Sequence, residues 1–131
     1  MSRLVLFLAA LAGCAGVDPP RCPAWADLSA WQVAGNGGQV QRDACGRPTV
    51  FAVQAPADVQ LTRALTGSHS LGALLTSDCR AGTLTIDRVP YLLTNSALYA
   101  SGVSEGNAYV RLTLPQACTG ALHIDLAEVR P

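Results

Sequence analysis

Tyr109-Val110-Arg111-Leu112-Thr113-Leu114 is the stretch of this sequence that decides the fold. Apolar side chains alternate there with aromatic, charged and hydroxyl-bearing ones. Successive side chains of a β-strand point to opposite faces of the sheet, so this alternation predicts a strand with one buried face and one solvated face. Leu122-His123-Ile124-Asp125-Leu126-Ala127 follows the same pattern and predicts a second strand near the end of the chain.

Shorter runs of the same kind lie upstream. Apolar and polar residues alternate at residues 59–65 and 83–87, and residues 49–54, rich in β-branched and aromatic side chains, predict a strand that ends at Pro56. Twelve glycines and eight prolines divide the chain of 131 residues. Such short segments between turn-forming residues are typical of an all-β fold, here a small antiparallel β-sandwich or barrel. A helix is hardest to exclude at residues 23–30 and 71–76.

Gly35-Asn36-Gly37-Gly38 carries a clear turn signal. An Asn-Gly pair adopts the positive φ angles that a two-residue hairpin turn requires. The four residues lie between two strand-like triplets, residues 31–33 and 40–42. The sequence thus predicts a hairpin at this position.

The N-terminus has the three parts of an export signal. Arg3 supplies a positive charge, residues 4–11 form an apolar run, and small residues follow. A signal peptide is built in this order, whereas a transmembrane helix needs about 20 apolar residues and this run meets Asp18 too early. Leu11-Ala12-Gly13-Cys14 resembles the lipobox of bacterial lipoproteins.

The lipobox resemblance implies that the chain is cut before Cys14 and lipidated on its thiol. The lipid chains would then hold the protein on a membrane of the bacterial cell envelope. Ala15 follows the lipidated residue, which in a Gram-negative lipoprotein implies the outer membrane. The expected organisation is a signal peptide over residues 1–13, a lipidated tether over residues 14–24 and a β-sandwich domain over residues 25–131.

Four cysteines are left when Cys14 is set aside, an even number that suits disulfides in an oxidising compartment. They allow three pairings. We favour Cys22 with Cys45 and Cys79 with Cys118, because each bridge then closes one half of the chain. Zinc ligands are closely spaced in sequence, as in Cys-x-x-Cys, and no two of these cysteines are. We therefore expect no metal or other cofactor.

The charge of the chain bounds its partners. Nine basic and nine acidic side chains give a net charge of zero. Proteins that bind nucleic acid carry a basic excess to meet the phosphates, so we expect no nucleic-acid partner. The expected partners are the membrane, through the anchor at Cys14, and an envelope protein or a glycan.

Aromatic and polar side chains offer a candidate binding surface. The three tyrosines, with Trp25 and Trp31, are able to form a platform for a sugar or a protein. His123 and Asp125 are two positions apart, so on a strand they share the polar face. The candidate surface comprises Tyr91, Tyr99, Tyr109, His123 and Asp125.

Gly102-Val103-Ser104-Glu105-Gly106 matches the Gly-x-Ser-x-Gly nucleophile elbow of α/β-hydrolases. The elbow needs a helix after the serine, yet residues 107–114 have the pattern of a strand. A flexible β-turn has the same composition, and we interpret the segment as a turn. No catalytic residue is expected, and a hydrolase that uses Ser104 is the enzymatic alternative.

Two resemblances concern the remainder of the chain. Phe51-Ala52-Val53 and Gly106-Asn107-Ala108-Tyr109-Val110-Arg111-Leu112 resemble two strands of the bacterial pre-peptidase C-terminal type of β-sandwich, which implies a sandwich fold. Ala100-Ser101-Gly102 is similar to the Ser-Gly element of the inhibitory loop of membrane-bound lysozyme inhibitors, which are small β-barrel lipoproteins. The expected function is a non-enzymatic binding or structural module of the envelope. The alternative is a lysozyme-inhibitor-like or other ligand-capturing lipoprotein.

Replacing Cys14 by serine is expected to release the protein from membranes, because the lipid chains would have no thiol to occupy. Membrane fractionation followed by immunoblotting measures this. A Cys14→Ser protein that stays in the membrane fraction with its leader uncut would contradict the lipoprotein assignment.

Overall fold

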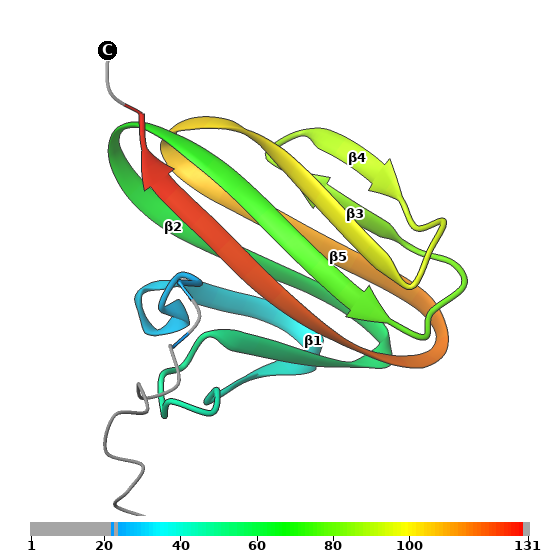
Figure 1. Ribbon diagram of the computed structural model, residues 1–131. Helices are drawn as coiled ribbons and strands as arrows, with labels where there is room; N and C mark the ends of the chain where they lie inside the picture. The colour runs from blue at the N-terminus through cyan, green and yellow to red at the C-terminus, as the bar shows by residue number, and fades with distance from the viewer. Residues whose placement is uncertain (1–21, 23, 130–131) are drawn as a thin grey trace, which may run out of the picture.

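The computed structural model describes residue 22 and residues 24–129, and Figure 1 shows strands wrapped into a two-layered body. Cys14, the lipobox and most of the predicted tether lie outside the described residues. The predicted all-β class is confirmed. Among the described residues, no helix is long and apolar enough to cross a membrane. The elements are η1 (Leu28–Ala30), a single 3-10 turn, and the strands β1 (Gln32–Gln41), β2 (Val50–Ser77), β3 (Thr83–Ile86), β4 (Val89–Leu92) and β5 (Ala97–Glu128).

Two long bent strands, β2 and β5, build the body of the sandwich. All pairings are antiparallel, and hydrogen bonds join the strands in the order β1-β2-β5-β3-β4. Residues 70–76 of β2 have β5 on both sides, at residues 97–103 and at residues 121–127. These three segments, together with residues 50–55 and 38–41, form one layer, which we call layer B. Layer A consists of residues 32–36, 57–64 and 107–114 with β3 and β4.

The core lies between the two layers. Inward positions alternate with outward ones along each strand, as the sequence predicted. In β2 the odd-numbered residues from Phe51 to Leu61 are buried, and in β5 the even-numbered residues from Ala108 to Leu114 are buried, with Leu122 and Ile124. Burying one such aliphatic or aromatic side chain contributes about 1.5–3 kcal/mol. The confirmed β-sandwich is therefore held together by side chains from both layers.

Pro56 does not end its strand, so that prediction was wrong. β2 continues past it, with a register shift against β5 between Ala55 and Ala57. Proline lacks the N–H that a strand ladder needs and is tolerated at such irregularities. The Ala55–Pro56 peptide bond is cis. The irregularity lies where β2 leaves layer B for layer A.

The predicted hairpin at residues 35–38 was also wrong. Both halves of β1 pair with β2, and the register shifts between Asn36 and Gly38. Gly37 has a φ of 98°, and a Cβ added to it would lie 2.4 Å from the Cβ of Ala57. The glycines therefore allow a close crossing from one layer to the other, rather than a reversal of the chain.

The two segments for which a helix was hardest to exclude have different structures. Residues 71–76 are strand, and most of their side chains are buried. In residues 23–30 the described part contains only the turn η1, where the carboxylate of Asp27 accepts a hydrogen bond from the Ser29 N–H at 2.8 Å. Leu28 of this turn is buried in the core.

The favoured disulfide pairing is confirmed. Cys22 is bonded to Cys45, with 5.8 Å between their Cα atoms, and Cys79 is bonded to Cys118, with 5.1 Å. The second bridge ties the segment after β2 to β5 at the point where β5 changes layer. The first ties the N-terminal segment to the loop that joins β1 to β2.

Replacing both Cys79 and Cys118 by serine is expected to lower the free energy of unfolding by about 3–4 kcal/mol, because a 39-residue loop is released in the unfolded chain. Urea unfolding followed by circular dichroism measures the change. The matched Cys22→Ser/Cys45→Ser variant releases a 23-residue loop and is expected to lose about 3 kcal/mol. An unchanged unfolding midpoint for the first variant would contradict a stabilising role for this bridge.

Candidate binding face

The outer face of layer B carries a polar and aromatic surface, which we call the candidate face. Directly opposite residues of an antiparallel pair point to the same side of the sheet. Leu74 is opposite His123 on one side and Tyr99 on the other, and Gly72 is opposite Asp125 in the same way. Ala52 is opposite both Gln39 and Ala121. The candidate face comprises Gln39, Gln41, Ala52, Gln54, Leu74, Tyr99, Thr119, Ala121, His123 and Asp125.

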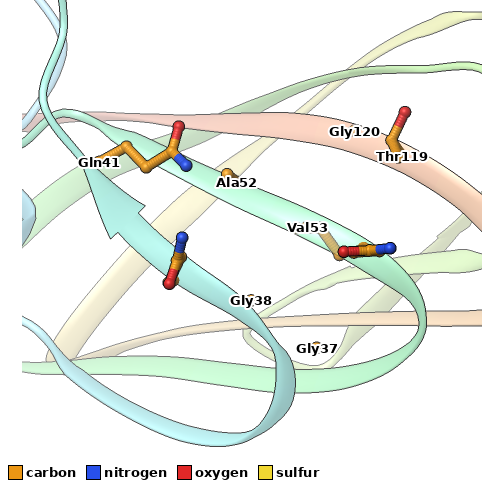
Figure 2. A pocket seen from close by; sticks show the side chains of 9 residues that line it. Gly37, Gly38, Gln41, Ala52, Val53, Thr119 and Gly120 are labelled. Carbon is orange, nitrogen blue, oxygen red and sulfur yellow. The ribbon is translucent and has the colours of Figure 1, made fainter.

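One half of the candidate face is hollowed. The hollow is open to solvent, with a volume of about 510 Å³. Figure 2 shows the amide of Gln41 and the hydroxyl of Thr119 on the strands to either side of Ala52. Glycines and Ala52 form the floor of the hollow, where they have no side chain or a short one. The amides of Gln39, Gln41 and Gln54 lie at its rim. These three amides make no hydrogen bond with any residue the structure describes, so each offers a donor and an acceptor to a ligand.

Tyr99 provides the aromatic part of the face. Tyr99 is 53% exposed. A Cβ added to Gly72 would lie 2.2 Å from the Tyr99 hydroxyl oxygen, so the ring lies across the bare backbone of the neighbouring strand. A flat ring held against a sheet is suited to stacking on a planar or weakly polar surface. Asp125, opposite Gly72 on the other side, places an exposed carboxylate in the same row.

Trp25 and His123 extend the face at its N-terminal margin. Their ring centroids are 5.1 Å apart, with 36° between the planes. The Ala26 N–H donates to the carbonyl of Ile124 at 2.7 Å, which fixes the segment beside β5. Burial lowers the pKa of His123, and the carboxylate of Asp43 opposes that shift only in part. The Nδ1 atom of His123 is buried without a hydrogen-bond partner in the described structure.

The predicted surface residues are divided between two places. Tyr99, His123 and Asp125 share the candidate face. Tyr91 and Tyr109 lie instead in a groove beside the turn between β3 and β4. The sequence did not single out the glutamines of the hollow, whereas it indicated both Trp25 and His123, whose rings lie beside each other. Gln39 and Gln41 are two positions apart in a strand, and this spacing alone could have predicted that both amides lie on one face of the sheet.

The surroundings of Ser104 suit a structural role and not that of a nucleophile. The segment 102–106 was interpreted as a turn, but it lies within β5, so that interpretation was wrong. Ser104 is only 2% exposed, and its hydroxyl donates to the carboxylate of Asp87 at 2.5 Å. A serine nucleophile needs access to substrate and a base for its proton. The hydroxyl of Ser104 instead donates its hydrogen to Asp87, the residue at the turn between β3 and β4.

Two further features bear on other expected sites. Asp78, Cys79 and Cys118 place their ligand atoms within 4.8 Å of one another. Both sulfurs belong to the disulfide and are not thiolates, so this set does not suit a metal. Ala100-Ser101-Gly102, the segment similar to an inhibitory loop, lies inside β5 and does not protrude as a loop.

Comparison with known proteins identifies the fold. No protein-family model and no curated protein sequence matches the chain. Among solved structures, TmCBM61 in complex with β-1,4-galactotriose superposes with a TM-score of 0.55 at 11% identity, over 79% of this chain and 91% of that one. The chain has the β-sandwich fold of this carbohydrate-binding module.

Two more solved structures are similar at lower scores. A family 29 carbohydrate-binding module matches with a TM-score of 0.48 and 8% identity, over 77% of this chain and 82% of that one. The N-terminal cellulose-binding domain of a Cellulomonas fimi β-1,4-glucanase matches with a TM-score of 0.44 and 13% identity, over 78% of this chain and 91% of that one.

The stability of the protein is expected to fall as the pH drops below about 6.5, the ordinary pKa of histidine. The pKa of His123 is lowered in the folded state, so the unfolded chain binds the proton more readily and protonation favours unfolding. The contribution of His123 to the free energy of unfolding is fully present above about pH 6.5. It is lost as the pH falls towards the lower pKa of His123 in the folded state. Thermal unfolding at pH 7.5 and 5.5 measures it. His123→Gln is expected to reduce the dependence, whereas the control His69→Gln retains it. An equal dependence in both variants would contradict the assignment to His123.

Proposed function

We propose that this chain binds uncharged oligosaccharide or polysaccharide chains across the candidate face. The observation that carries the proposal is the open hollow rimmed by three unpartnered glutamine amides, on the same face as the exposed ring of Tyr99. Sugar hydroxyl groups both donate and accept hydrogen bonds, and an amide side chain does both as well. The C–H face of a sugar ring is apolar enough to pack against an aromatic ring.

The charges of the face favour an uncharged ligand. Asp125 is the one carboxylate of the candidate face, and the face contains no lysine or arginine. Burial lowers the pKa of His123 and so favours its uncharged imidazole form. A chain of uronic acids would therefore meet the negative charge of Asp125, and no residue of the candidate face would compensate for it. An open hollow on a sheet also suits a linear chain that extends beyond the site at both ends.

The shared fold guides the choice of ligand for the first test. TmCBM61 was solved with β-1,4-galactotriose, so β-1,4-galacto-oligosaccharides are the natural first probe. The proposed role is binding without catalysis, because the hydroxyl of Ser104 is buried and bonded to Asp87.

The location is part of the same proposal. The lipobox residues Leu11-Ala12-Gly13-Cys14 support a lipid anchor on the bacterial cell envelope, and Ala15 supports the outer membrane in a Gram-negative host. A glycan-binding domain held on a membrane would keep that membrane close to a polysaccharide. Domain boundaries at residues 14 and 25 follow from this arrangement and remain a prediction.

Tyr99→Ala is expected to weaken oligosaccharide binding at least about tenfold, which corresponds to 1.4 kcal/mol, because the stacking surface is lost. Tyr99→Phe retains the ring and is expected to bind nearly as well as the unchanged protein. Isothermal titration of the mature, detergent-solubilised protein with β-1,4-galactotriose and cellotriose gives the affinities.

A matched pair of glutamines provides the control. Gln54 and Gln60 both belong to β2 but lie on the outer faces of different layers. Gln54→Ala is expected to weaken binding and Gln60→Ala to leave it unchanged. If a panel of uncharged glycans shows no binding, or if Tyr99→Ala binds as tightly as the unchanged protein, the proposal fails.

A further inference from the structure

A second depression lies on the side of the sandwich where β4 and the first part of β5 are edge strands. This groove has a volume of about 740 Å³, within the range of small-molecule sites and larger than the hollow of the candidate face. We call it the edge groove. Tyr91 bounds it, and the Tyr91 hydroxyl donates to the carbonyl of Ser101 at 3.1 Å, from one layer to the other.

The edge groove is built around the turn between β3 and β4. Asp87 has a φ of 58° at this turn, and its N–H donates to the carbonyl of Tyr109 at 2.8 Å. The buried hydroxyl of Ser104 holds the Asp87 carboxylate at 2.5 Å. These bonds tie Asp87 to two positions of β5 that are distant from it in sequence, so the wall of the groove is fixed before any ligand arrives. Ser104 thereby has a role in positioning the groove.

Gly102 opens the floor of the groove. It lines the groove, and the nearest atom to a Cβ added there would be the Cγ2 of Ile86, at 3.7 Å. That distance is an ordinary van der Waals contact, so the fold itself does not require a glycine for lack of space. The missing side chain leaves room between the layers, and a larger residue would occupy that room.

The polar lining combines donors with acceptors. Arg88 is exposed and makes no ion pair or hydrogen bond with the described residues, so its guanidinium is available to a ligand. Glu105 accepts a hydrogen bond from the Ser68 hydroxyl at 2.6 Å and retains further acceptor capacity. Asn107 adds an exposed amide. Such a mixture complements hydroxyl groups, each of which donates and accepts.

Apolar surface lies between these polar groups. Val103 is 66% exposed and Val89 is 53% exposed, and both line the groove with the ring of Tyr109. A ligand with hydroxyl groups on its rim and C–H groups on its faces matches this alternation, as a sugar does. Asp87 and Glu105 oppose an anionic ligand, and Arg88 opposes a cationic one.

We infer that the edge groove is a second saccharide site, independent of the candidate face, that takes an uncharged sugar unit. The mixture of exposed donors and acceptors with apolar side chains along the groove supports this ligand class. This inference does not require the candidate face to bind. Each site has its own residues and its own variants.

Titration of the ¹⁵N-labelled mature protein with lactose, cellobiose and a uronic-acid disaccharide tests the inference. The expected result is that an uncharged disaccharide shifts the amide resonances of Arg88, Val103 and Asn107, and that the uronic-acid disaccharide shifts them less. If none of the three sugars shifts these resonances, or if the acidic sugar binds more tightly, the inference is overturned.

Two variants make the test specific. Gly102→Val fills the floor and is expected to weaken disaccharide binding at least about tenfold, while binding of β-1,4-galactotriose at the candidate face is retained. Tyr99→Ala is expected to have the opposite pattern, so the failure of one site is distinguishable from the failure of the other. Should Gly102→Val not fold, the exposed pair Arg88→Ala and Asn107→Ala replaces it. Unchanged disaccharide affinity in a folded variant of this set overturns the groove as the site.

Discussion

The inward alternation of β2 and β5 is the constraint on which the rest of the molecule depends. Both strands cross from one layer to the other, and the odd-numbered residues of β2 stay inward from Phe51 to Leu61 across that crossing. A slip of one residue would turn the whole inner set to solvent. At the irregularity around Pro56, β2 therefore has to change direction while its odd-numbered side chains continue to point inward. The candidate face exists because the outward set, including Ala52 and Gln54, is kept in the same phase.

The parts of the fold that follow from local pattern were predictable from sequence. The alternation at residues 109–114 and 122–127 specified strands with one buried face, and the structure has them. The cysteine pairing followed because each bridge closes one half of the chain. The crossings between layers were not predictable in this way. Gly37 and Pro56 are common in turns, and only the long-range pairing with β2 or β5 makes each one part of a continuous strand.

The candidate site was predictable only in part. His123 and Asp125 share a face because they are two residues apart in one strand, and local spacing is sufficient for that. The grouping of all three tyrosines failed because it depends on which layer each strand joins. Tyr99 belongs to the edge of layer B, whereas Tyr91 and Tyr109 come from segments paired in layer A. The unpartnered glutamines became notable only when the packing showed a hollow between them.

The bridge from Cys22 to Cys45 has a mechanical consequence for a chain anchored at Cys14. Seven residues lie between Cys14 and Cys22, so the eight Cα–Cα steps that join the two cysteines span at most about 29 Å. Tension on the anchor would pass through the covalent bridge into the loop between β1 and β2. The carboxylate of Asp43 stabilises this loop by accepting hydrogen bonds from the N–H groups of Cys45 and Arg47. Without the bridge, the same pull would peel Trp25 and Ala26 away from β5. In a chain anchored by a lipid at Cys14, the disulfide would therefore carry the load and keep it away from the aromatic margin of the candidate face.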